Sequence, residues 1–446
     1  MKDRADVLIV GAGAAGLSAA NELSAAGTDV MVLEGRQRLG GRIETMHDPA
    51  WPLPIERGAE FIHGKPRETW SIAEAGAACL YDLTDQHWVY EKGKLRKREG
   101  FFEQIEEALA VVEKVRGGAA ADVSLDEALA RYGNHQRESA RLARMYVSGF
   151  DAADPERVSS QWLAAVQKAS EKIEGDRLFR VYAGYDRIVQ FLQTGIADAG
   201  AHIEVGVVVR KVHWGEEGVR VEALSCEGEP RVYTGRAAVI TVPIGILHLA
   251  QGEEGRIAFD PELPAEKREA LGKLGMGNVV KVILRFSEPF WEKRISDLDF
   301  RHAPGAAFPT WWTTLPLRTA VLTGWAGGPA ADALSGHSED ELLTEAVKTL
   351  SKLMGVPRKK IEGLLAGAHV VDWRREPLTR GAYSYARVGG AAAARKLGRP
   401  VGGTLFFAGE ATETGLVGTV AGAIASGHRV AREILRAKSK NGKAKE

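Results

Sequence analysis

The two ends of this chain carry motifs that are typical of one shared nucleotide-binding site. Near the N-terminus, an apolar run over residues 7–10 leads into Gly11-Ala12-Gly13-Ala14-Ala15-Gly16 and then into a stretch with helical spacing. Near the C-terminus, residues 404–436 combine a strand-like run, Gly409-Glu410 and a glycine-punctuated helix. A site split in this way requires the chain to return to its starting point. The sequence therefore predicts an α/β protein that binds a dinucleotide.

Each glycine of the front motif has its own physical task. Gly11 permits a tight turn, Gly13 lets a pyrophosphate approach the positive end of the helix, and Gly16 lets helix and strand pack closely. Glu34 ends the second strand, residues 30–33, where it can accept hydrogen bonds from ribose hydroxyls. An acid there favours FAD or NAD over NADP. An ordinary glycine turn is the alternative, and the register of strand, helix and acid argues against it.

A second glycine pair follows the acid. Glu34-Gly35-Arg36 leads into Arg38-Leu39-Gly40-Gly41-Arg42-Ile43-Glu44-Thr45. Arginine offers paired donors to phosphate, and adjacent glycines let the backbone close over it. A solvated basic loop explains Arg36 or Arg38 alone but not the whole string. We therefore expect this string to bind the same cofactor.

Length and charge limit the kinds of partner. At 446 residues the chain exceeds what one core usually supports, so we expect two domains. Its 59 basic and 59 acidic residues balance, which argues against nucleic acid or an anionic membrane and leaves small molecules. Cys79 and Cys226 lack metal-ligand spacing, and we expect both to be reduced packing residues. Without room for a secretory leader or an apolar stretch of membrane-spanning length, a cytoplasmic location is expected.

The middle of the chain changes character twice. Residues 68–178 are mostly of helical spacing, and strand-like runs with few helices follow. We expect helices at 101–115, 125–132, 185–197 and 341–353, and strands at 203–212, 219–223, 237–242, 279–286, 311–312 and 321–325. This pattern predicts two interleaved domains, one from residues 1–67, 185–270 and 386–446, and a substrate-binding domain from residues 68–184 and 271–385.

Taken together, the motifs resemble those of the flavin-containing amine oxidase family, which holds monoamine oxidases, polyamine oxidases and flavin-dependent histone lysine demethylases. The resemblance covers most of the chain and rests on the glycine triplet and on residues 38–45, 58–64, 239–243, 276–286, 373–385 and 406–429. It implies a Rossmann-type FAD-binding domain interleaved with a substrate domain of mixed sheet plus helices, with FAD as the cofactor.

Lys281 stands out because it interrupts an apolar strand, residues 279–286. A cation there needs a partner or a cavity, unless it alternates outward to solvent. In the family that the chain resembles, a lysine at this position holds a water against flavin N5 and assists reoxidation by oxygen. The resemblance therefore implies a catalytic role for Lys281.

The resemblance also assigns aromatic residues and a histidine to the substrate site. Trp373 would flank the flavin ring, and Tyr383 would form a wall of the slot through which an amine reaches N5. Such a wall orients the amine and keeps the site dry. His63 lies in a segment similar to one that brings a histidine near substrate in polyamine oxidases. A purely structural role is the alternative for each, and we prefer it for Tyr385.

For the cofactor, the resemblance implies three kinds of contact. Amides at the start of the helix near Thr419 would donate to the flavin pyrimidine, Glu410 would bind FAD hydroxyls, and Val208 would touch adenine through its backbone. The predicted FAD contacts are Gly11, Gly13, Ala15, Gly16, Glu34, Gly35, Arg36, Gly41, Arg42, Gly58, Ala59, Glu60, Val208, Thr241, Trp373, Gly409, Glu410, Thr419 and Val420.

Departures from the monoamine oxidase pattern are informative. Where those enzymes attach flavin through cysteine, this chain has Ala382, so FAD is expected to be non-covalent. Where they place the second tyrosine of the aromatic cage, this chain has Thr419. With His63, this favours the polyamine oxidase branch. Glu60 stands where the family usually has a neutral residue, which suggests a negative charge for a second ammonium group.

The resemblance thus implies an FAD-dependent amine oxidase acting on a small-molecule amine with O2 as acceptor. Hydride transfer from the carbon beside the nitrogen to flavin N5 would give an imine, then an aldehyde and hydrogen peroxide. The oligomeric state stays open. So do an L-amino-acid oxidase with an arginine clamp from Arg42, Arg57 or Arg67, an FAD-dependent desaturase, against which Lys281 argues, and a non-catalytic FAD-binding protein.

Overall fold

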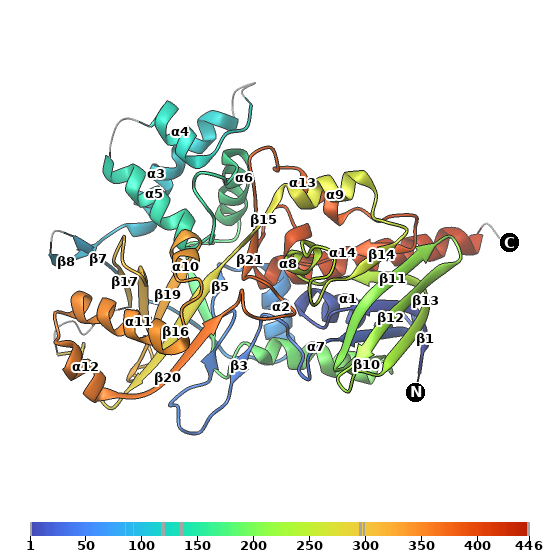
Figure 1. Ribbon diagram of the computed structural model, residues 1–446, viewed down its shortest axis with the longest axis horizontal. Helices are drawn as coiled ribbons and strands as arrows, with labels where there is room; N and C mark the ends of the chain where they lie inside the picture. The colour runs from blue at the N-terminus through green and yellow to red at the C-terminus, as the bar shows by residue number, and fades with distance from the viewer. Residues whose placement is uncertain are drawn as a thin grey trace.

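Two large sheets stand on opposite sides of the molecule in the structure, a computed structural model (Figure 1). It describes residues 2–443 except 85, 92, 117–120, 134–136, 294–296 and 298. A cluster of helices lies above one sheet, and both chain ends lie beside the other. The space between the sheets is where the two halves of the chain meet.

The first sheet has eight strands and a parallel centre. β10, β2, β1, β13 and β22 run parallel, so their carboxyl ends share one edge. Every residue of β2 is buried, as expected for a strand covered on both faces. The strands are β1 (Arg4–Val10), β2 (Val30–Glu34), β10 (His202–Val205), β11 (Val207–Gly215), β12 (Gly218–Ser225), β13 (Pro230–Ile240), β14 (Ala258–Asp260) and β22 (Leu405–Phe407).

The second sheet has seven strands in the order β20-β16-β19-β18-β17-β7-β8. β16 lies between β20 and β19, so Lys281 comes from a strand that is paired on both sides and not from an edge of the sheet. The strands are β7 (His87–Glu91), β8 (Lys94–Arg98), β16 (Val279–Phe286), β17 (Phe300–His302), β18 (Thr310–Thr313), β19 (Val321–Gly327) and β20 (Leu365–Asp372). Shorter pairings use β3 (Thr45–Met46), β4 (Ile55–Glu56), β5 (Ile62–His63), β6 (Leu80–Asp82), β9 (Leu178–Val181), β15 (Leu274–Gly277) and β21 (Tyr383–Ala386).

Helices pack on both sheets and begin or end at the expected residue types. α11 starts with a capping box at Ser338 and ends at Gly355, which has a left-handed backbone. α14 crosses α1 at Gly427, where a Cβ would lie 2.4 Å from the Ala15 carbonyl oxygen. The helices are α1 (Ala14–Ala25), α2 (Arg67–Ala75), α3 (Phe101–Arg116), α4 (Leu125–Tyr132), α5 (Arg137–Gly149), α6 (Ser160–Glu171), α7 (Asp186–Asp198), α8 (Ile244–Leu247), α9 (Ala265–Gly272), α10 (Pro329–Ala333), α11 (Glu339–Met354), α12 (Arg358–Leu364), α13 (Ala393–Gly398), η1 (Glu410–Thr412) and α14 (Val420–Lys443).

The structure adds to one expectation from the sequence and corrects another. Residues 68–178 carry α2 to α6, as expected of a mostly helical stretch, but they also carry β6, which pairs with β9, and β7, which pairs with β8 and β17. The aromatic and β-branched run at Trp88 to Tyr90 fits a strand better than a helix. Cys79 and Cys226 are free but exposed rather than packed, since each lies in a connection between two elements.

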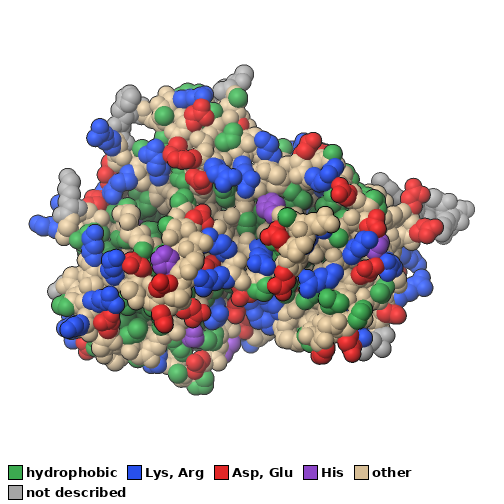
Figure 2. Space-filling view, in the orientation of Figure 1, with side chains coloured by type: hydrophobic (Ala, Val, Ile, Leu, Met, Phe, Trp, Pro, Cys, Tyr) green, Lys and Arg blue, Asp and Glu red, His purple; other side chains and the backbone are tan. Residues whose placement is uncertain are grey.

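The strands of the two large sheets come from different segments. Those of the eight-stranded sheet fall within residues 1–67, 185–270 and 386–446, and those of the seven-stranded sheet within 68–184 and 271–385. The division into a cofactor domain and a substrate domain remains our proposal, and this distribution supports it. Basic and acidic side chains are interspersed over the face in Figure 2. None of the described helices combines the length and hydrophobicity that crossing a bilayer requires.

Candidate functional site

A cavity of about 410 Å³ is lined by residues from both large sheets and from the end of α5. Every site residue predicted from the sequence lines it, except Gly16. We call the part lined by β1, β2, β13 and α14 the cofactor half. The part lined by β16, β18, β19 and the end of α5 is the substrate half.

The cofactor half lies at the carboxyl ends of the parallel strands. Gly11 follows β1 with φ +106°, Glu34 ends β2, Thr241 follows β13, and Gly409 comes shortly after β22 with φ +128°. In open parallel sheets, ligands bind in the crevice outside these strand ends. The residues predicted from two remote motifs therefore meet at one edge.

Local geometry at this edge fits a dinucleotide. Gly13, the N-cap of α1, gives the helix no side-chain cap, so the first amide groups of α1 are open to an anion. A Cβ at Gly11 would lie 2.7 Å from Thr241 Oγ1, and one at Gly16 would lie 2.0 Å from the Gly11 carbonyl oxygen. Gly16 therefore does not line the cavity, but its lack of a side chain lets α1 pack against the glycine turn behind the cavity wall. Glu34 accepts hydrogen bonds from two backbone amides, at 2.7 and 2.9 Å, which fixes the acid at the strand end.

The arginines of the basic string have different neighbours. Arg36 donates to Thr379 Oγ1 at 2.6 Å and pairs with Glu376 at 3.3 Å. Arg38 donates to loop carbonyls and pairs with Glu44, so it shapes the loop and does not line the cavity. Contact of Arg36 with FAD stays a prediction.

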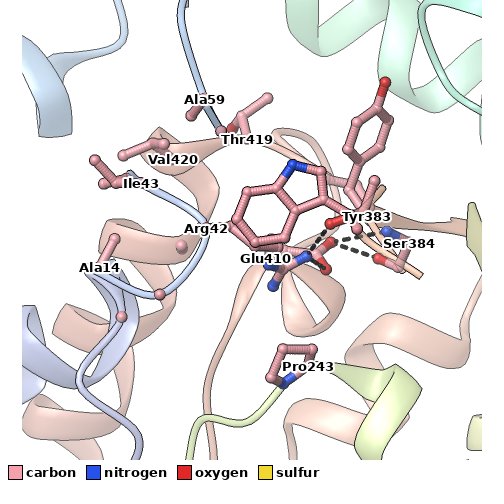
Figure 3. Close-up of a pocket in the computed structure, with 18 of the residues that line it drawn as sticks. Ala14, Arg42, Ile43, Ala59, Pro243, Tyr383, Ser384, Glu410, Thr419 and Val420 are labelled. Atoms are coloured by element: carbon pink, nitrogen blue, oxygen red, sulfur yellow. Dashed lines mark hydrogen bonds and ion pairs between the residues drawn. The ribbon is translucent and has the colours of Figure 1, made fainter. Parts of the chain in front are cut away.

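A buried network joins the loop after β2 to the closing segment (Figure 3). Arg42 Nη1 donates to the Ala382 carbonyl at 2.6 Å and to Glu410 at 2.8 Å. Glu410 also accepts from the hydroxyl of Ser384 at 2.5 Å and from its amide at 3.3 Å. Arg42 and Glu410, both among the residues predicted to contact FAD, are thus held by each other, and their contacts with FAD remain a prediction. Ser384 was not predicted, although its place beside Tyr383 was a signal.

Thr419 caps α14. Its hydroxyl oxygen accepts from the Gly422 amide at 3.0 Å and the hydroxyl donates to the Leu416 carbonyl at 2.7 Å. Because Thr419 and Val420 line the cavity, the positive end of this helix faces it. Figure 3 shows both residues opposite the Arg42 and Glu410 network.

Lys281 is buried, with 1% of its surface exposed, so the outward-facing alternative is wrong. Its Nζ donates to the Glu56 carbonyl at 2.6 Å and to Glu60 Oε2 at 2.7 Å. A third contact, to the Gly58 carbonyl, is long at 3.4 Å. Two strong bonds and one weak bond leave part of the ammonium available to the cavity.

Glu60 is fully engaged by the protein. Its Oε1 accepts from Arg180 at 2.8 Å and from Trp312 Nε1 at 2.9 Å, and its Oε2 accepts from Lys281. Burial raises the pKa of Glu60, but the charges of Lys281 and Arg180 lower it more, so the net pKa lies below its ordinary value. With two cations already paired to it, Glu60 has no free charge for a second ammonium group, and that interpretation is corrected. Nothing in the local sequence pointed to Arg180 or Trp312.

The predicted aromatic residues, Trp373 and Tyr383, line the cavity, and residues of other elements hold them in place. Trp373 is 4% exposed, and a Cβ at Gly58 would lie 3.1 Å from its ring. Tyr383 donates its hydroxyl to the Phe150 carbonyl at 2.6 Å. His63 contacts the Phe150 ring edge to face at 4.9 Å, and burial lowers its pKa to about 4. Its imidazole is therefore neutral at pH 7.

The substrate half also contains residues that sequence reasoning missed. Tyr146, Phe150 and Asp151 reach the cavity from the end of α5 and the turn after it. They belong to no motif, and a chain stretch of helical spacing gives no sign of which residues face a cavity. Only the packing of α5 beside β19 reveals them.

Similarity to known proteins extends over nearly the whole chain. A family model described as flavin-containing amine oxidoreductase matches residues 14–435. The chain is 30% identical, over 97% of its length, to lysine-specific histone demethylase 1 homolog 2 of Oryza sativa subsp. japonica, but it spans only 57% of that relative. It is 28% identical to polyamine oxidase 2 of Arabidopsis thaliana, over 97% of this chain and 89% of that one. A wild-type putrescine oxidase bound to putrescine shares the fold, with TM-score 0.81 and 21% identity over 98% of this chain and 100% of that chain.

Proposed function

Since the chain belongs to the flavin-containing amine oxidoreductase family and has FAD as its cofactor, we propose that it oxidises small aliphatic amines with O2 as acceptor, forming an imine, an aldehyde and hydrogen peroxide. One observation carries this proposal: a buried lysine and an aromatic wall open into the same cavity as the dinucleotide cradle. FAD would supply the redox chemistry by accepting a hydride from the carbon beside the amine nitrogen. We further propose that FAD is held without a covalent bond, because Ala382 lines the cavity and both cysteines lie outside its lining.

The protein's part is to bind a neutral amine and to handle a proton. Trp373 and Tyr383 form apolar walls that orient the amine and exclude water. Lys281 is held by Glu56 and Glu60, and its weakly bonded third N–H is the one that can turn to a water in the cavity. A water held there by Lys281 would exchange a proton during reoxidation.

The arrangement gives less support to an L-amino-acid oxidase. Among the described residues lining the cavity, the arginines are Arg36 and Arg42, and both are paired within the protein. Arg57 and Arg67, the other candidates for a carboxylate clamp, lie outside the lining. An amine without a carboxylate therefore fits the site better.

The direct test is anaerobic mixing of the yellow protein with monoamines, polyamines, N-methylated amines and L-amino acids. We expect flavin absorbance to bleach with one class of simple amines and peroxide to form when air is admitted. Bleaching by L-amino acids alone would favour the amino-acid oxidase. No bleaching by any compound would contradict the proposal and favour a desaturase or a non-catalytic flavoprotein.

Lys281→Met tests the proton role. We expect reduction by amine to persist while reoxidation by O2 slows by about 100-fold, the usual scale for loss of a positioned acid or base. Lys211→Met, which removes a half-buried lysine from β11 outside the cavity lining, is the matched control. Unchanged reduction and reoxidation in Lys281→Met would remove the proposed role.

A further inference from the structure

Four carboxylates line the cavity, and three of them are satisfied by the protein. Glu34, Glu60 and Glu410 each accept the hydrogen bonds described above. Asp151, the fourth, makes no hydrogen bond or ion pair with any residue that the structure describes. A carboxylate withdrawn from bulk water normally finds a partner in its own chain. Asp151 is therefore open to a ligand.

Asp151 lies in a turn, residues 149–153, that is fixed from the neighbouring sheets. Tyr383 donates to the Phe150 carbonyl at 2.6 Å, and the indole N–H of Trp325 donates to the carbonyl of the first residue of the turn at 2.8 Å. In Figure 3 the Tyr383 ring points away from the Arg42 and Glu410 network. The wall of the amine slot and the turn that carries Asp151 are thus one unit.

The same turn holds a strained residue. Ala152 has a left-handed backbone with φ +47°, which is uncommon for a residue with a side chain. A Cβ at Gly277 would lie 2.4 Å from the Ala152 carbonyl oxygen, so glycine is needed for β15 to come this close. Strain that is held by its surroundings concentrates at ligand sites. The fold therefore fixes the position of Asp151 at an energetic cost.

Among the residues that the structure describes, none pairs a positive charge with Asp151. Tyr146 stacks on Phe150 at 4.7 Å, and burial together with the charge of Asp151 raises the pKa of both Tyr146 and Tyr383. Both hydroxyls stay neutral, as does His63. Burial raises the pKa of Asp151 itself to about 7. A cation from outside the protein would complete this part of the cavity.

Building on the proposed amine oxidase function, we propose that Asp151 binds a second cationic group of the substrate. The preferred substrate class is then an aliphatic amine with a further ammonium or guanidinium group. The reacting amine lies beside Trp373 and Tyr383 while the far end pairs with Asp151. A substrate with an uncharged far end leaves the carboxylate unpaired, which is the physical basis of selection.

The test compares 1,4-diaminobutane with n-pentylamine, which have equal length and differ in the charge of the far end. Anaerobic stopped-flow bleaching gives a dissociation constant and a limiting rate for each. For Asp151→Asn we expect the diamine to bind roughly 10- to 100-fold more weakly, with pentylamine nearly unchanged. Asp154→Asn is the matched control, because its carboxylate caps the Glu156 amide outside the cavity lining. Adding 4-guanidinobutylamine as a third substrate in the same assay shows whether Asp151 binds guanidinium or ammonium more tightly.

Equal weakening of both amines in Asp151→Asn would overturn the proposal, since Asp151 would then act on the reacting amine or on the pocket shape. Equal binding of both amines by the wild type would overturn it as well. Asp151→Glu keeps the charge and should keep the diamine preference, even if Asp151→Asn does not fold. Loss of the diamine preference in Asp151→Glu would overturn the proposal.

If no amine bleaches the flavin, the proposed function fails but the subsite is still decided. Calorimetric titration of the yellow protein with 1,4-diaminobutane then supports the subsite if binding is lost in Asp151→Asn. Binding that is equal in wild type and variant, or absent from both, overturns it.

Discussion

The two halves of the cavity are built in different ways. In the cofactor half, recognition rests on backbone geometry: a glycine turn, two helix starts and strand ends that share an edge. In the substrate half it rests on charged and aromatic side chains that come from separate elements. The first half tolerates changes that keep the backbone path, and the second depends on which charges find a partner.

Within the substrate half, two acids differ in whether their charge is paired by the protein. Glu60 and Asp151 both line the cavity, yet Glu60 is neutralised by two cations and Asp151 by none that the structure describes. The acid close to Lys281 is thus structural, and the acid in the turn after α5 is the one that we propose binds a ligand. Position in sequence did not reveal this difference.

Glu60→Gln should have the largest effect on stability. It leaves Lys281 and Arg180 buried beside a neutral group, which costs about 3–5 kcal/mol in the free energy of unfolding. Urea unfolding of the yellow protein measures it, with Glu174→Gln, an exposed ion-pair partner, expected to change little. If Glu60→Gln instead weakened diamine binding alone, the assignment of the two acids would be reversed.

Gly16→Ala breaks the cofactor half through the backbone. The new Cβ would lie 2.0 Å from the Gly11 carbonyl oxygen, so the turn must shift, at about 2–3 kcal/mol, or about 30- to 160-fold in FAD affinity. The ratio of flavin to protein absorbance after purification measures the loss. Gly272→Ala, with open space around the new methyl, is the control. Retained flavin in Gly16→Ala would show that the turn is not held this tightly.

Asp151→Asn should stabilise the protein without substrate at high pH. The folded pKa of Asp151, about 7, lies above its ordinary 3.8, so its stabilising contribution is complete below pH 3.8 and is lost as pH rises to about 7. Tyr146 and Tyr383, which face it, stay neutral. We expect a gain of about 2 kcal/mol at pH 8, less than the full linkage because the cavity is open to water.

Thermal unfolding at pH 8 and pH 4.5 measures this gain, and Asp154→Asn serves as the control. A gain that is equal at both pH values would mean that ionisation of Asp151 is not its source. A loss at pH 8 would mean that Asp151 has a partner in the folded protein.

Tyr383→Phe should have the smallest effect. It removes the 2.6 Å bond to the Phe150 carbonyl, worth about 1 kcal/mol, and so loosens the turn that holds Asp151. We expect diamine affinity to fall about fivefold, more than pentylamine affinity, in the stopped-flow assay. Combined with Asp151→Asn, the two effects should not add. Additive losses of diamine affinity would mean that Tyr383 does not act through the turn that holds Asp151.

The fold class and the cofactor half could be predicted because their signals are local. Gly11, Gly13, Glu34 and the segment at Gly409 carry their function in backbone shape and short spacing, and Lys281 was marked by a charge inside an apolar strand. Strands such as β7 were missed because they are short, lie in a stretch that is otherwise mostly helical, and pair with a strand that is remote in the sequence, β17.

What the sequence alone determined is therefore the dinucleotide cradle and the family of chemistry that goes with it. Tertiary structure decided which charges are free. Glu60 meets Arg180 and Lys281 only in the folded chain, and Asp151 meets neither. Because burial makes an unpaired charge costly and a paired one nearly neutral, the function of an acid depends on its neighbours in space, which no local pattern records.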